Sequence, residues 1–94
     1  MKKILDFLRE RSYTLIFGWV DKRTVGVIDF EEEKIIINLE LFVVDTYIHE
    51  YLHAVYPNLN EKKIQKKTIC YIKRLTVKEI RQLCKKILKK GVER

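Results

Sequence analysis

The stretch KIIINLELFVVDTYIHEYLHAVYP, residues 34–57, joins a strand pattern directly to a helix pattern. Its three consecutive isoleucines predict a strand over residues 34–39, covered on one face and partly shielded on the other. From Asp45 to Tyr56 the apolar residues recur at helical spacing, and Asp45 is a favourable N-cap residue. Pro57 ends this helix, because proline disfavours a helical backbone in the residue before it.

The residues before this stretch predict one helix and two further strands. Residues 2–11 place apolar side chains at helical spacing, with charges opposite, so we expect a short amphipathic helix there. Residues 12–20 and 24–30 are rich in β-branched and aromatic residues, and the turn over residues 21–23 predicts that they form a hairpin. Together with residues 34–39 they would make a three-stranded, mostly antiparallel sheet.

Two more helices are expected after Pro57. Asn60 can cap a helix that runs to about Leu75, and Thr76 with Glu79 has the spacing of a capping box for a last helix ending near Gly91. The order is helix, three strands, three helices, which is typical of an α+β domain. No linker or internal repeat divides the chain, so residues 1–94 are interpreted as a single domain.

The composition is that of a folded, basic protein. Hydrophobic residues make up 47% of the chain, which argues against disorder. A net charge of +7 would attract nucleic acid, anionic membranes or acidic proteins, although the Lys- and Ile-rich composition is also typical of thermophile surfaces. Nothing resembles a signal peptide or a membrane-spanning run, so a cytoplasmic protein without a membrane partner is expected. Cys70 and Cys84 show no metal-site spacing and are expected to be small buried hydrophobes.

The helix after the sheet contains the pattern H-E-x-x-H, from His49 to His53. A spacing of four puts both imidazoles on one helix face, where they can share one metal ion. Glu50 lies about 100° further around the helix axis, so it flanks the ion and can act as a base toward water. The chain has only two histidines, and a spacing of four arises by chance in about 2% of such pairs. We therefore interpret them as metal ligands.

A tetrahedral site needs a third protein ligand besides two imidazoles and a water molecule, and the sequence holds no third histidine. Glu61 follows the turn at Pro57, and an antiparallel helix pair would bring it back toward His53. Glu79, further along the chain, is the alternative. Each also has a structural interpretation: Glu61 could stabilise a helix dipole, and Glu79 could be the acid of the capping box. From the residues alone, the third ligand could be Glu61, Glu79 or neither of them.

The fragment HEYLHAVYPNLNE, residues 49–61, resembles the zincin metallopeptidases of the gluzincin type, in particular the very small single-domain minigluzincins. The resemblance covers about residues 34–68. It implies a zinc-dependent metallopeptidase with His49, His53 and Glu61 as zinc ligands, Glu50 as catalytic base and a polypeptide as substrate. The short spacer before Glu61 departs from the usual gluzincin pattern.

Two other functions are carried as alternatives. The last two expected helices hold many lysines and arginines and could bind nucleic acid, although Tyr71 is the only aromatic residue among them. A catalytically latent zinc-binding regulatory protein is the other alternative. The residues assign no oxyanion donor among the tyrosines near the motif (Tyr47, Tyr51, Tyr56, Tyr71), and they leave the oligomeric state open.

Overall fold

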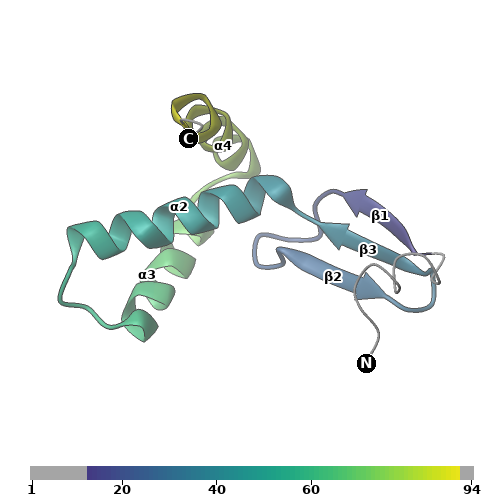
Figure 1. Cartoon of the computed structure of the whole chain (residues 1–94), viewed down its shortest axis with the longest axis horizontal. Coiled ribbons are helices and arrows are strands. Elements are labelled where there is room, and N and C mark those ends of the chain that lie inside the picture. Colours follow the sequence, from purple (N-terminus) through teal and green to yellow (C-terminus); the bar gives the residue numbers. More distant parts are fainter. Residues whose placement is uncertain (1–12, 92–94) are drawn as a thin grey trace.

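The computed structural model describes residues 13–91, so the helix expected over residues 2–11 lies outside the described residues. The described chain is α+β: a three-stranded mixed sheet is followed by three helices. The strands are β1 (Thr14–Phe17), β2 (Gly26–Asp29) and β3 (Lys34–Ile37), and the helices are α2 (Leu39–Val55), α3 (Glu61–Arg74) and α4 (Val77–Lys90). The sheet lies at one end of α2, and α3 and α4 pack against different sides of that helix (Figure 1).

The sheet has the strand order β1-β3-β2, so the expected hairpin between the first two strands is wrong. β3 lies between them, parallel to β1 and antiparallel to β2, and the sheet is mixed instead of mostly antiparallel. Among the described strands, β3 has all four residues partly buried, whereas β1 is exposed throughout. The strand with three consecutive isoleucines takes the more buried central position, where both of its edges are hydrogen-bonded.

The hairpin that does form joins β2 to β3 through residues 30–33. The Asp29 carboxylate accepts hydrogen bonds from the backbone N–H groups of Glu31 and Glu32, each at 3.0 Å. Glu33 completes the turn with a φ of 50°, in the left-handed region. An Asp side chain that bonds the backbone two residues on is a common way to start such a turn.

Helix α2 begins at Leu39, so the expectation that Asp45 caps it is wrong. The N-cap is Asn38, whose side-chain oxygen accepts a hydrogen bond from Leu41 N at 2.9 Å. The backbone N–H of Asn38 also donates to Val25 O at 2.7 Å, which ties the helix start to the segment before β2. Asparagine caps helices as well as aspartate does, and the apolar pattern continues upstream to Leu41, so Asp45 lies inside the helix.

The core is a small helical one. Its fully or nearly buried side chains come from α2 (Leu41, Val44, Ile48, Leu52), α3 (Ile64, Ile72) and α4 (Ile80, Cys84). The expected caps of the last two helices are confirmed, with Asn60 capping α3 and a complete Thr76–Glu79 capping box on α4. In the described residues, no helix has the length and apolarity needed to cross a membrane.

Substitution of Asn38 tests how strongly the junction between sheet and helix depends on its cap. Asn38→Ala removes the hydrogen bond to Leu41 N inside the protein, so we expect a loss of about 1 kcal/mol in unfolding free energy. For a domain of this size the melting temperature should fall by roughly 4–8 °C. Asn58→Ala, in the exposed turn between α2 and α3, is the matched control and should change little. Equal melting temperatures for the two variants would contradict this role for Asn38.

The two cysteines differ, which corrects the expectation that both are buried. Cys84 is buried in the core, whereas Cys70 is exposed on α3. Burial raises the pKa of the Cys84 thiol, and the nearby Glu40 carboxylate raises it further. Since the thiolate is the reactive form, we expect a maleimide at neutral pH to label one cysteine, Cys70, in the native protein and both in denaturant. Mass spectrometry of the labelled peptides checks this, and fast native labelling of Cys84 would contradict it.

Candidate metal centre

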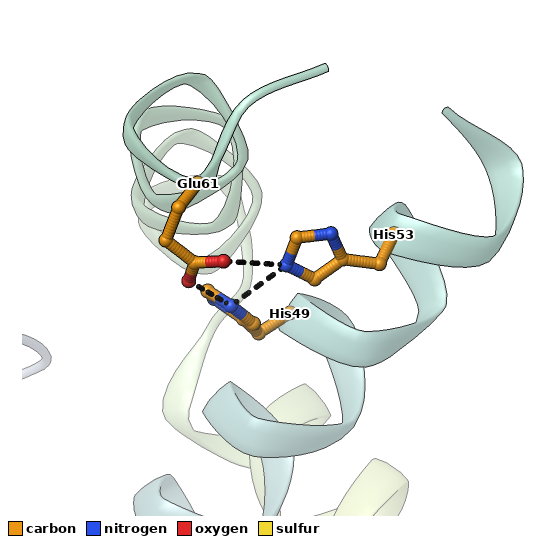
Figure 2. A group of neighbouring side chains, drawn as sticks. All are labelled: His49, His53 and Glu61. Carbon is orange, nitrogen blue, oxygen red and sulfur yellow. Dashed lines mark hydrogen bonds and ion pairs between the residues drawn. The ribbon is translucent and has the colours of Figure 1, made fainter. Parts of the chain in front are cut away.

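Helix α2 places its two histidines one turn apart on the side that faces α3 (Figure 2). The ring centroids of His49 and His53 are 4.9 Å apart, and their Nε2 atoms are separated by 3.2 Å. Both side chains are partly buried, with 20% and 33% of their surface exposed. The spacing of four residues therefore places both imidazoles on one helix face, as the sequence predicts. Both Nε2 atoms point to a common position.

The chain reverses between the helices through residues 56–60. Tyr56 ends α2, and its backbone N–H donates to Leu52 O. The backbone N–H of Leu59 donates to Tyr56 O at 3.2 Å. Asn60 then caps α3, because its side-chain oxygen accepts from Lys63 N at 2.9 Å. This turn makes Glu61 the first residue of α3. The first turn of the new helix therefore returns to the C-terminal half of α2.

Glu61 faces both histidines from the neighbouring helix (Figure 2). Its Oε1 lies 2.5 Å from His49 Nε2, and its Oε2 lies 2.8 Å from His53 Nε2. One potential ligand atom from each of the three residues lies within 4.8 Å of the others. The carboxylate is more exposed than the rings, at 58%, so the group opens to solvent on the α3 side.

The spacing of these three side chains is compatible with one shared cation. A neutral imidazole carries a single N–H, and a carboxylate only accepts hydrogen bonds. If both Nε2 atoms donated to Glu61, two N–H groups would face each other across 3.2 Å. A tetrahedral ion with ligand bonds of about 2 Å holds its ligands about 3.3 Å apart. The two Nε2 atoms are close to that spacing, at 3.2 Å, whereas the Glu61 oxygens lie closer to the rings, at 2.5 and 2.8 Å. The geometry is compatible with a metal ion held by His49, His53 and Glu61.

The other candidate third ligand, Glu79, is used elsewhere. Its carboxylate accepts a hydrogen bond from the backbone N–H of Thr76 at 3.0 Å, and its own N–H donates to the Thr76 hydroxyl at 3.1 Å. The hydrogen bond from the Thr76 backbone N–H, with a further contribution from the Thr76 side chain, lowers the pKa of the Glu79 carboxyl below its usual range. Between the two acids that the sequence leaves open, the structure brings Glu61 to the histidines and leaves Glu79 in its capping box.

Glu50 is exposed and lies outside the group of three ligands. It follows His49 directly on α2, so its side chain leaves the helix about 100° further around the axis. The tyrosines near the motif have other contacts. Tyr47 and Tyr51 stack on each other with ring centroids 6.3 Å apart, and the Tyr56 ring lies 4.8 Å from the Lys67 ammonium. None of these contacts assigns an oxyanion donor.

A hollow of about 200 Å³ lies between α2 and α3 beside His49. It is lined by Asp45, His49, Gln65, Thr68 and Ile69. Asp45 lies one helical turn before His49, and burial raises the pKa of its carboxyl, an effect that His49 partly offsets. Sequence reasoning had assigned Asp45 only to a helix cap. The signal that it belongs to this face was its position four residues before the first histidine.

Comparisons of the chain with protein-family models, with curated proteins and with solved structures find no match. Any functional argument therefore depends on the geometry of this site and on its residues.

Loss of the third ligand should weaken metal binding without unfolding the protein. We expect wild type to retain about one zinc ion per chain, and Glu61→Gln to bind it roughly tenfold or more weakly, because an amide oxygen is a poorer ligand than a carboxylate. Glu79→Gln is the matched control, since glutamine can still close a capping box. Titration calorimetry with zinc chloride measures both. Unchanged affinity in Glu61→Gln, or equal losses in the two variants, would contradict the assignment.

Proposed function

We propose that the chain is a zinc-dependent metallopeptidase of the zincin type, similar in its ligand pattern to gluzincins, with a polypeptide as substrate. The observation that carries the proposal is the convergence of His49, His53 and Glu61 from two helices on one position. Two imidazoles and one carboxylate are a common donor set for catalytic zinc, because they leave the fourth position of the ion free. The resemblance of residues 49–61 to gluzincins points to the same set.

The donor chemistry supports zinc as the ion. Calcium and magnesium prefer all-oxygen sites, whereas imidazole ligands favour zinc and other transition metals. The site contains two imidazole nitrogens and a single carboxylate. Zinc bound there would supply Lewis-acid chemistry, polarising the peptide carbonyl and a water molecule.

Residues of the chain would perform the remaining steps. Glu61 and the two histidines hold and orient the centre, and Glu61 reduces its positive charge. The Glu50 carboxylate takes a proton from the attacking water and later passes it to the nitrogen of the leaving amine. Glu50 suits this exchange because it is exposed, and because no described hydrogen bond or ion pair engages its side chain.

The exposure of the site also agrees with a macromolecular substrate. The Glu61 side chain is more than half exposed, and the adjoining hollow of about 200 Å³ is open to solvent. A polypeptide segment could approach these ligands from outside without a channel. A buried site of the same composition would instead suit a structural ion, since structural zinc sites are closed by four protein ligands.

The proposal is tested by separating catalysis from metal binding. We expect the zinc-loaded wild type to cleave unfolded casein or a quenched peptide library. Glu50→Gln should lose activity by about 10²–10⁴-fold, because it removes general acid–base catalysis, yet keep the same zinc content by mass spectrometry. Glu79→Gln serves as the control for an exposed glutamate at a distance from the ligands.

Removal of the metal completes the test. Treatment with 1,10-phenanthroline should abolish cleavage, and added zinc should restore it. Full zinc occupancy without cleavage of any substrate would contradict the peptidase proposal and favour the latent zinc-binding alternative. Cleavage that survives in Glu50→Gln would indicate a contaminating protease or another base.

A further inference from the structure

The charges of the chain are segregated between its two halves. Residues 61–90, which form α3 and α4, contain twelve of the twenty lysines and arginines but only two carboxylates, Glu61 and Glu79. Residues 13–56 contain eight carboxylates and three basic side chains. The net charge of +7 is therefore unevenly distributed. The helices α3 and α4 are strongly positive, whereas the part that includes the sheet and α2 is acidic. The electrostatic field of this arrangement attracts anions to one part of the surface.

A groove between α4 and α2 concentrates this positive charge. Its volume is about 280 Å³, with Leu83 and Ile87 among its lining residues and Lys86, Lys89 and Lys90 around them. A second hollow of about 390 Å³ continues along α4 and is lined by Gln82, Lys85, Lys86 and Lys89. Neither hollow has a carboxylate among its lining residues. Among the ion pairs between described residues, none uses these four lysines.

An aromatic side chain completes the groove from the other helix. Tyr47 of α2 is one of its lining residues, and its ring stacks on Tyr51 with an interplanar angle of 15°. Both rings remain about half exposed, at 48% and 53%. The sequence shows only Tyr71 among the basic helices. Packing α4 against α2 brings one exposed tyrosine, Tyr47, beside the lysines of α4.

We propose that this groove between α2 and α4, lined by Tyr47, Leu83, Lys86, Ile87, Lys89 and Lys90, binds single-stranded nucleic acid. The lysines neutralise backbone phosphates, and a base stacks on the exposed face of Tyr47. Exposed aromatic rings beside a positive groove are the features that sequence-tolerant single-strand binding requires. An acidic polypeptide would satisfy the lysines but would make no use of the tyrosine ring, so the position of Tyr47 favours the nucleic acid.

The groove is separate from the candidate metal centre. The candidate metal ligands come from α2 and α3, whereas the groove is lined by residues of α2 and α4. Helices α3 and α4 lie on different sides of α2 (Figure 1). No residue lines both. Binding in the groove should therefore be the same with and without zinc, and the failure of either proposal leaves the other intact.

Fluorescence anisotropy of the full chain with a labelled oligothymidylate of about 16 nucleotides tests the proposal. We expect binding that weakens steeply with salt. Lys86→Glu/Lys89→Glu should raise the Kd at least roughly tenfold, and Tyr47→Leu roughly fivefold or more. Matched controls on α3 are Lys63→Glu/Lys66→Glu, with the same charge change and spacing, and Tyr71→Leu, also an exposed tyrosine. These controls should change the Kd by less than about threefold.

Three outcomes would overturn the proposal. The first is an absence of binding at low salt. The second is an equal loss in the α3 and α4 lysine variants, which would mean that total charge alone attracts the oligonucleotide. The third combines two results: the Tyr47→Leu variant binds with the wild-type Kd, and polyglutamate of equal length is as effective a competitor as oligothymidylate. Together these results would assign the groove to acidic polypeptides.

Discussion

One face of α2 is a buried apolar stripe, made of Leu41, Val44, Ile48 and Leu52. The burial of this stripe determines how the rest of the helix is oriented. Each such side chain contributes about 1.5–3 kcal/mol when it leaves water. A rotation of α2 that moved the two histidines away from α3 would expose these residues, at a cost far above the strength of any single contact in the site. The positions of the two histidines are therefore a consequence of core packing.

The same constraint determines where the third ligand can come from. Pro57 and the turn to Asn60 reverse the chain, and Ile64, which is fully buried, fixes the rotation of α3. Glu61 is three residues before Ile64 and so emerges from the N-terminus of α3 next to α2. A carboxylate there is also favourable for the helix dipole. The helical role that the sequence suggested for Glu61 and its role beside the histidines are thus compatible.

Features that depend on neighbouring residues were predicted correctly from the sequence, whereas the pairing of distant strands was not. The spacing of His49 and His53, the Asn60 cap and the Thr76–Glu79 capping box each depend on residues within one helical turn, and the structure has them all. The hairpin between the first two strands was wrong because nothing local shows that β3 lies between them. The exposed position of Cys70 was also missed, since residue type gives only an average tendency to be buried.

The choice between two good caps shows why local patterns can still mislead. Asn38 and Asp45 are both favourable N-cap residues, and each precedes apolar residues at helical spacing. The structure uses Asn38, because starting there buries Leu41 and Val44 as well. One consequence concerns Asp45: it is held inside α2, on the face of His49, with its carboxyl partly desolvated. Tertiary packing, which the sequence does not display locally, places the expected cap residue beside the candidate metal centre instead.

Helix α2 contributes residues to three different surfaces, and no side chain belongs to more than one of them. Its start is joined to the sheet through Asn38, one side carries the histidines, and another side carries Tyr47 beside the lysines of α4. His49 lies ten residues after Leu39, or about 15 Å along the helix at 1.5 Å per residue. An extended peptide would need roughly four or five residues to span that length. If the proposed polypeptide substrate also paired with the sheet, roughly four or five of its residues would therefore separate that pairing from the candidate metal ligands.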